Sequence, residues 1–207
     1  MYTHSKQIIR AGYSPDDAEQ AIIMIHGRGA SAANIVTLAE HLNLPRTAIL
    51  APQATNNSWY PYSFMAPVED NQPALNSALK VIDEVIGEII KNDIALNRIF
   101  FLGFSQGACL TLEYTARNAA KYGGIIAFTG GLIGETLNIA NYMGDFSQTP
   151  FLITTGDPDP HVPLSRVEES IAVLKTMNAQ VSSRVYRGKP HSISMEEIEL
   201  ANELILL

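Results

Sequence analysis

The 207-residue sequence has little cysteine, a deficit of positive charge and no long apolar run. Its one cysteine, Cys109, excludes an internal disulfide framework and is typical of a reducing compartment. Fourteen Lys and Arg residues stand against 21 Asp and Glu, a formal net charge of −7, which argues against nucleic acid or an anionic membrane surface as the main partner. No apolar stretch reaches the roughly 18 residues of a membrane span, and the first residues are polar, unlike a signal peptide. We therefore expect a cytoplasmic protein without membrane insertion.

Metal-binding and cofactor-binding patterns are missing as well. There is no His-x-x-x-His, no cysteine pair and no carboxylate cluster at ligand spacing, so we expect no metal. Gly27-Arg28-Gly29 follows an apolar run, as a dinucleotide fingerprint would, but the third glycine is absent and no acidic residue ends the next apolar run. The sequence therefore predicts no nicotinamide cofactor, and we expect no other cofactor.

Short apolar runs alternate with longer helical patterns along the chain. Ala21–Ile25 is apolar at every position, as a central strand covered on both faces would be. We expect strands at residues 7–10, 21–25, 47–51, 99–102, 125–128, 151–154 and 181–185, and helices at 31–41, 75–90, 108–121, 164–177 and 194–206. This order predicts an α/β fold with a mostly parallel, doubly wound sheet between two helical layers. Because no linker or repeat divides the pattern, residues 1–207 are expected to form a single domain.

The most informative motif is Gly103-Phe-Ser-Gln-Gly107, which lies between a predicted strand and a predicted helix. A serine in such a sharp turn is held at positive φ with its hydroxyl exposed, and the flanking glycines let the two elements pass closely. The Gln106 amide then lies at a helix N-terminus, where developing negative charge is stabilised. The motif predicts Ser105 as a nucleophile and the Gln106 amide as an oxyanion donor. A chance match is the alternative, and the strand–turn–helix context weakens it.

The turn after the first long apolar run, His26-Gly-Arg-Gly-Ala-Ser31, is a second candidate for chemistry. Ligands of such sheets bind at the carboxyl ends of the strands, so this turn is expected near Ser105. Its two glycines can curl the backbone so that the Arg28 amide points inward as a second oxyanion donor. The alternative is a plain glycine turn before a helix that Ser31 caps, and both can hold together.

Two later turns offer an acid and a base. The turn at residues 156–163 contains Asp157 and Asp159, and spacing alone does not choose between them; a proline-stiffened structural turn is the alternative. His191 stands in the loop before the last helix and completes the chain order Ser, Asp, His that esterases of this type of fold use. His161, inside the acid loop, is the weaker rival as base.

Together these turns resemble the phospholipase/carboxylesterase family of α/β-hydrolases, which includes bacterial carboxylesterases and acyl-protein thioesterases. The matching pieces span nearly the whole chain in the family's order: His26-Gly-Arg-Gly29, Gly103-Phe-Ser-Gln-Gly107, Gly156-Asp-Pro-Asp-Pro-His-Val-Pro163 and Gly188-Lys-Pro-His191. The resemblance implies an α/β-hydrolase domain without a separate lid, and it implies Asp159, in an Asp-x-x-Val-Pro context, as the acid. Family members often carry Leu and Asp where this chain has Arg28 and Ala30, which favours a more polar pocket wall.

The resulting hypothesis is a serine hydrolase that cleaves carboxylic esters by a Ser-His-Asp triad through an acyl-enzyme. Acyl-protein or other thioesterases and lysophospholipases would use the same residues. A non-catalytic binding member of the fold is a further alternative, which the presence of all the catalytic residue types disfavours. The expected partner is a small-molecule ester or thioester. Acyl length, leaving group and oligomeric state are left open, with a homodimer as one option.

An aromatic segment at residues 58–65, which holds the only tryptophan, is expected at the catalytic edge of the sheet. It could wall an apolar acyl pocket or serve only to pack a long loop. A glycine-rich turn at 130–134 could shape the pocket floor. The candidates for substrate contact in these two segments are Trp59, Phe64, Met65 and Leu132.

Overall fold

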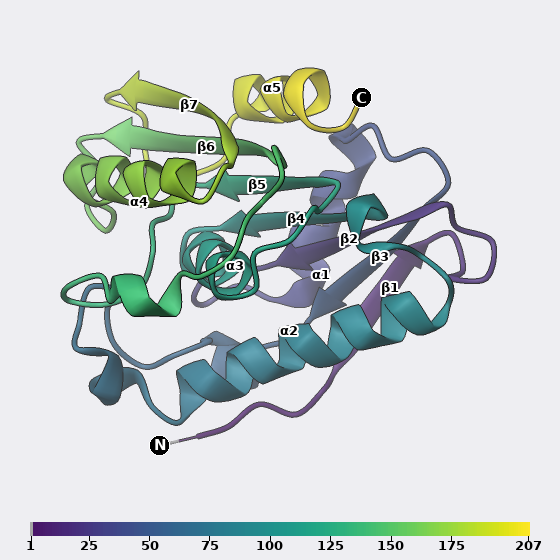
Figure 1. Cartoon of the computed structure of the whole chain (residues 1–207), viewed down its shortest axis with the longest axis horizontal. Helices are drawn as coiled ribbons and strands as arrows, with labels where there is room; N and C mark the ends of the chain where they lie inside the picture. The colour runs from purple at the N-terminus through teal and green to yellow at the C-terminus, as the bar shows by residue number, and fades with distance from the viewer. Residues whose placement is uncertain (1) are drawn as a thin grey trace.

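A computed structural model describes residues 2–207, and one seven-stranded sheet organises them (Figure 1). The strands are β1 (Ile8–Gly12), β2 (Gln20–Ile25), β3 (Thr47–Pro52), β4 (Ile99–Phe104), β5 (Gly124–Phe128), β6 (Pro150–Asp157) and β7 (Gln180–Arg187). They lie in the order β1-β3-β2-β4-β5-β6-β7, and all neighbours are parallel except β1, which pairs antiparallel with β3. The prediction of a mostly parallel sheet is confirmed.

Five α-helices cover the two faces of this sheet and make the predicted three layers (Figure 1). They are α1 (Ala32–Val36), α2 (Ala74–Lys91), α3 (Gln106–Arg117), α4 (Leu164–Thr176) and α5 (Met195–Leu204). Helices α2, α3 and α4 pack on one face, and α1 and α5 pack on the other. None of the helices within residues 2–207 is long and apolar enough to cross a membrane.

Strand β2 shows how the two faces of the sheet are filled. Successive side chains of a strand point to opposite faces, so Ile23 and Ile25 enter the core shared with α2 and α3. Ile22 and Met24 enter the core shared with α1 and α5. All four side chains are fully buried. Burial on both faces explains why the strand is apolar from Ala21 to Ile25 and lacks the alternation of a half-exposed strand.

The predicted helix at residues 31–41 differs in form from the prediction. Only α1 is α-helical, and Thr37–His41 continues as a tighter 3-10 helix. The start is as expected, because the Ser31 side chain accepts a hydrogen bond from a first-turn amide in a capping box. The three consecutive β-branched residues at 35–37 have restricted side-chain rotamers in an α-helix, which disfavours its continuation.

The backbones of β4, α3 and β2 approach one another closely where β4 turns into α3. A Cβ on Gly103 would lie 2.4 Å from the carbonyl oxygen of Gly107, and a Cβ on Gly107 would lie 2.1 Å from the carbonyl oxygen of Ile25. Only glycine fits at either position, because backbone atoms occupy the space that a side chain would need. This contact sets Ser105 at the carboxyl edge of the sheet.

The contact predicts that Gly107→Ala lowers the free energy of unfolding by about 3 kcal/mol or more, because the main chain of β2 cannot move aside for the new methyl group. Urea unfolding followed by circular dichroism measures the change. Gly87→Ala is the matched control: its Cβ in α2 would meet nothing within 4 Å, and the better helix propensity should add about 1 kcal/mol. Equal stability of the two variants would contradict the close packing.

Candidate active site

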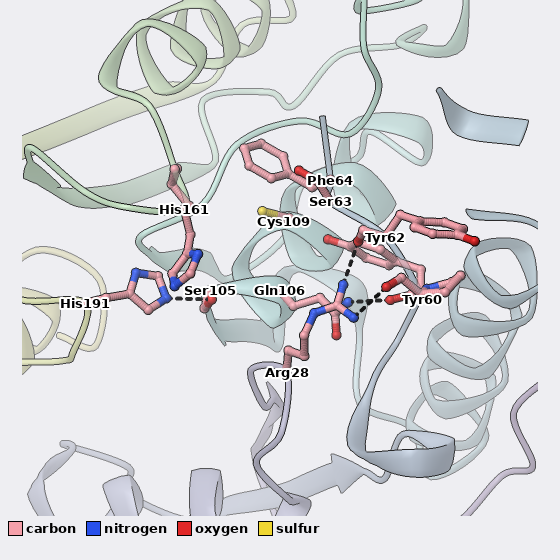
Figure 2. Close-up of a pocket in the computed structure, with 12 residues that line it drawn as sticks. Arg28, Tyr60, Tyr62, Ser63, Phe64, Ser105, Gln106, Cys109, His161 and His191 are labelled. Carbon is pink, nitrogen blue, oxygen red and sulfur yellow. Dashed lines mark hydrogen bonds between the residues drawn. The ribbon is translucent and has the colours of Figure 1, made fainter. Parts of the chain in front are cut away.

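Three side chains that lie far apart in the sequence meet at the carboxyl ends of the strands. The His191 Nε2 atom lies 2.8 Å from Ser105 Oγ, and His191 Nδ1 lies 2.8 Å from Asp159 Oδ2. Ser105 stands between β4 and α3, Asp159 follows β6, and His191 follows β7. Figure 2 shows the hydrogen bond that joins Ser105 and His191. A hydroxyl, an imidazole and a carboxylate in this chain of contacts have the arrangement of nucleophile, base and orienting acid.

The backbone of Ser105 has the strained conformation expected for the turn. Its φ is 54° and its ψ is −119°, a region that residues with a side chain rarely adopt. Two hydrogen bonds hold the turn: the Ser105 amide donates to the Phe128 carbonyl at 3.0 Å, and the Cys109 amide donates to the Ser105 carbonyl at 2.9 Å. The second bond also starts α3, so the strain is maintained by the helix that follows.

Asp159 is held as an anion. Its side chain is 1% exposed, and Oδ1 accepts hydrogen bonds of 2.9 Å from the amides of both His161 and Val162. Burial opposes ionisation, but the hydrogen bonds from His191 and from these amides outweigh it, so the pKa of Asp159 is lowered. The other candidate acid, Asp157, is exposed at the end of β6. An ionised Asp159 accepts from His191 Nδ1–H, which leaves Nε2 free to accept the Ser105 proton.

His161, the weaker candidate base, lies beside the chain of contacts rather than in it. Its ring meets the His191 ring edge-on, with 4.9 Å between centroids, and both rings lie at the pocket (Figure 2). The hydrogen bond from His161 to Asp159 comes from the main chain, and within residues 2–207 its side chain makes no hydrogen bond to Ser105. The structure therefore places His191, not His161, against the serine.

The two amides predicted as oxyanion donors lie in the turns that flank Ser105. A Cβ on Gly27 would lie 3.4 Å from the Ser105 Cβ, so the turn that carries Arg28 packs directly on the serine. Gly29 turns the chain with a φ of 77°. Across residues 2–207, neither the Arg28 amide nor the Gln106 amide has a hydrogen-bond acceptor, and both residues line the same pocket as Ser105.

The Arg28 side chain has a role that the sequence did not reveal. Its Nη1 donates to Ser58 Oγ at 2.9 Å and to the Pro61 carbonyl at 2.8 Å. Its Nη2 donates to the Tyr62 carbonyl at 2.5 Å, and Figure 2 shows this bond. These contacts fasten the segment at 58–62 against the turn that flanks Ser105. The one hint of this role in the sequence is an arginine at a position where members of the resembled family often carry leucine. The residues that Arg28 contacts are some 30 positions away in the sequence, and no motif points to them.

Trp59 supports the pocket from behind. It is fully buried and is not among the residues that line the pocket. Its indole Nε1 donates to the His26 carbonyl at 2.9 Å, and its ring packs between the rings of His4 and His26, at centroid distances of 5.3 and 5.1 Å. The Gln106 side chain fixes the same segment, because Oε1 accepts from the Trp59 amide and Nε2 donates to the Tyr60 carbonyl, both at 2.8 Å.

His4 and His26 are both held in the neutral form. The Thr55 amide donates to His4 Nδ1 at 3.0 Å, and the Ala54 amide donates to His26 Nε2 at 3.1 Å, so each of these nitrogens must be unprotonated. Burial lowers the pKa of both imidazoles. These two side chains therefore hold the start of the segment that carries Trp59 through hydrogen bonds that protonation would break.

The pocket at Ser105 has a volume of about 380 Å³, within the range of small-molecule sites. Of the predicted wall residues, Phe64 lines it, whereas Met65 and Leu132 do not; Leu132 is fully buried, with its amide bonded to Ser170. The lining residues are Arg28, Tyr60, Pro61, Tyr62, Ser63, Phe64, Ser105, Gln106, Cys109, His161, Val162 and His191 (Figure 2). Within residues 2–207 no group of three potential metal ligands is found.

Cys109 lines the pocket one helical turn after Ser105 but is not poised as a nucleophile. Its thiol is 1% exposed, and burial raises its pKa to about 12. Because the thiolate is the nucleophilic form of cysteine, the thiol stays unreactive near neutral pH. Of the two groups, the Ser105 hydroxyl is the one that lies against an imidazole, 2.8 Å from His191 Nε2.

The loop that carries His191 is fixed by a buried ion pair. Lys189 Nζ lies 2.9 Å from Glu197 Oε2, and the two side chains are 9% and 0% exposed. Lys189 also donates to the Ser192 carbonyl at 2.6 Å, just past His191. Glu197 in turn forms a capping box with Ser194 at the start of α5. The ion pair thus connects both sides of the His191 loop to α5.

Comparison with known proteins gives consistent matches over nearly the whole chain. A family model described as Phospholipase/Carboxylesterase matches residues 7–206. A crystal structure of a phospholipase/carboxylesterase from Dyadobacter fermentans is 63% identical, superimposes with a TM-score of 0.99, and covers 100% of this chain and 99% of that chain. Acyl-protein thioesterase 1 of Kluyveromyces lactis is 30% identical, over 92% of each protein. A carboxylesterase from Bacillus cereus shares the fold, with a TM-score of 0.78 and 19% sequence identity. The match covers 96% of this chain and 92% of that chain. The predicted α/β-hydrolase fold is confirmed.

The ion pair predicts that Glu197→Gln lowers the free energy of unfolding by about 3–5 kcal/mol, because Lys189 is left buried without a counter-charge. Urea unfolding measures this. Glu199→Gln, at an exposed position of α5, is the control and should change stability by less than about 0.5 kcal/mol. If Glu197→Gln were as mild as the control, the ion pair would not hold the loop.

The neutral histidines predict that stability falls as the pH drops below 6.5, the ordinary pKa of the imidazole. The unfolded chain takes up these protons near that pH, whereas the folded chain does so only at lower pH, so the unfolded state binds more protons in between. Urea unfolding at a series of pH values measures the slope. His4→Gln combined with His26→Gln should flatten it, while His41→Gln, at an exposed position, should leave it unchanged. An unaltered slope in the double variant would contradict the assignment.

Proposed function

This chain belongs to the phospholipase/carboxylesterase family of α/β-hydrolases and acts as a serine hydrolase on ester bonds, and we propose that Ser105, His191 and Asp159 carry out the reaction. The observation that carries the proposal is the position of His191, 2.8 Å from both the serine hydroxyl and the carboxylate, at the edge of a pocket of small-molecule size. All three residues come from turns at one edge of one sheet, so a single domain without a separate lid is sufficient for the reaction.

In the first step His191 Nε2 accepts the Ser105 proton while Oγ attacks the ester carbonyl carbon. Asp159 remains ionised and stabilises the imidazolium that forms. The imidazolium then donates its proton to the leaving alcohol oxygen as the bond from that oxygen to the carbonyl carbon breaks, which leaves an acyl group on Ser105. In the second step His191 takes a proton from a water molecule, and the water oxygen attacks the acyl carbon. The bond from that carbon to Ser105 Oγ then breaks, the imidazolium returns the proton to Oγ, and the carboxylic acid leaves.

The negative charge on the carbonyl oxygen needs donors that are already in place. We assign this role to the amides of Arg28 and Gln106, which flank Ser105 in the two adjacent turns and have no acceptor within residues 2–207. The Gln106 amide is also the first of α3, so the partial positive charge of the helix N-terminus adds to its effect. Each such donor contributes about 3–4 kcal/mol of transition-state stabilisation in comparable sites.

A thioesterase is the second candidate function. It is supported by the 30% identity to the Kluyveromyces lactis protein named acyl-protein thioesterase 1. The same groups would act, because a thiolate leaves the tetrahedral intermediate more easily than an alkoxide and needs no further residue. A small ester or thioester as the main partner agrees with the net charge of −7, which argues against nucleic acid or an anionic membrane surface. The single cysteine is consistent with the reducing environment of the cytoplasm.

The triad predicts that a fluorophosphonate probe labels Ser105 and that Ser105→Ala abolishes both labelling and hydrolysis of p-nitrophenyl acetate. Ser63→Ala, the other serine that lines the pocket, is the control and should keep both. Mass spectrometry of the labelled peptide identifies the site. Labelling that persists in Ser105→Ala would overturn the proposal. Rates on an acyl-CoA and an acylated peptide, measured beside the ester, separate the thioesterase from the esterase.

A further inference from the structure

The guanidinium of Arg28 is a positive charge in the pocket without an acidic partner. Within residues 2–207 it forms no ion pair, as is also true of the exposed Arg98, Arg184 and Arg187, which do not line the pocket. The other four arginines, Arg10, Arg46, Arg117 and Arg166, each contact a carboxylate. Every partner of the Arg28 side chain is an uncharged oxygen. The residues that line the pocket with Arg28 include neither Asp nor Glu. Arg28 is exposed and lines the pocket of Ser105, so its charge is open to a ligand as well as to water.

The contacts of Arg28 leave one edge of the guanidinium free. An arginine has five N–H donors, and Nη1 uses two and Nη2 uses one on the acceptors at Ser58, Pro61 and Tyr62. The remaining donors are Nε–H and one N–H of Nη2, which lie side by side on the same edge. In Figure 2 the end of the Arg28 side chain points toward Tyr60 and Tyr62. Two parallel N–H groups at this spacing match the two oxygens of a carboxylate.

A second polar group of the same wall is also unpaired. Tyr60 is 1% exposed and lines the pocket, and its ring centroid lies 5.9 Å from the Arg28 Cζ atom. Its buried hydroxyl has no hydrogen-bond partner of ordinary geometry within residues 2–207, although the weakly bonding thiol of Cys109 lies nearby. Buried hydroxyls are rarely left without a partner. The hydroxyl lies behind the pocket surface, so Arg28 supplies the donors that this wall presents to a ligand, and Tyr60 makes the wall behind it polar.

We propose that Arg28 binds a carboxylate of the substrate through Nε and Nη2, so that this enzyme prefers esters that carry a second, free acid group. The proposal rests on the proposed function, because it places that acid group in the pocket of Ser105. Arg28 then acts twice: its amide serves the oxyanion, and its side chain selects the substrate. The neutral ester of the same shape leaves the charge of Arg28 unmatched, and the difference between the two substrates measures the contact.

Two pairs of substrates test the proposal and locate the acid group. Monomethyl succinate and dimethyl succinate differ in a carboxylate on the acyl side of the scissile bond. Acetoxyacetic acid and methyl acetoxyacetate differ in a carboxylate on the alcohol side. We expect the wild-type enzyme to favour the acid of one pair by about 10- to 100-fold in kcat/KM, as a charged hydrogen-bonded pair provides. The preference should shrink as ionic strength rises if the pair is partly open to solvent.

Arg28→Met should remove this preference, and the ratio of acid to neutral ester within one variant is the decisive quantity. Loosening of the segment at 58–62 would lower both rates together and leave the ratio unchanged, which would overturn the proposal. Ser58→Ala weakens the same anchor but keeps the charge, so it should retain the ratio. Arg98→Met removes an exposed arginine just before β4, at the opposite end of that strand from Ser105, and should change neither rate nor ratio.

The outcomes separate the two proposals. Hydrolysis that depends on Ser105 but shows no acid preference in either pair would leave the proposed function intact and refute the role of the Arg28 side chain. Absence of any Ser105-dependent hydrolysis would refute the proposed function itself. An acid preference that survives in Arg28→Met would assign the selectivity to another group and overturn the inference.

Discussion

The site depends on the contact of main chain with main chain between β4, α3 and β2. Because Gly103 and Gly107 carry no side chains, α3 can start directly against the carbonyl oxygens at the end of β2. Only Ser105 lies between the end of β4 and the start of α3, so the chain changes direction at this residue, at a φ of 54°. The cost of this conformation, of order 1–3 kcal/mol, is met by the packing of a central strand and a buried helix. The rigid backbone of Ser105 therefore follows from the fold, not from any partner of the serine side chain.

Around this fixed point, the other parts of the site are held by buried polar contacts rather than by apolar packing. The loop that carries His191 is tied to α5 by the Lys189–Glu197 pair. The pocket wall is tied to the turn after β2 by Arg28 and to α3 by the Gln106 side chain. Hydrogen bonds of this kind have defined directions, so they set the loops at distances that apolar contacts alone would not determine. These contacts hold His191 within hydrogen-bonding distance of Ser105 and fix the pocket wall beside it.

Local patterns in the sequence predicted the strands, the sheet and the turns that bear Ser105, His191 and Arg28. Such features depend on spacing within a few residues: an apolar run, two glycines, a short loop before a helix. The contacts that complete the pocket could not be predicted in this way. The Arg28 side chain reaches a segment 30 residues away, and Trp59 turns inward between two histidines instead of facing the ligand. Whether a loop aromatic faces the pocket or the core is decided by tertiary packing, about which a single sequence says little.

The anchor of the pocket wall has a consequence for how the enzyme can diverge. Two of the three acceptors of Arg28 are main-chain carbonyls, at residues 61 and 62, which every amino acid provides. Mutations that exchange the side chains of this segment therefore leave most of the anchor in place. The shape and polarity of the wall can drift over evolutionary time while its attachment to the β2 turn persists. New substrate ranges are accessible to such a lineage without first passing through a loosened, inactive intermediate.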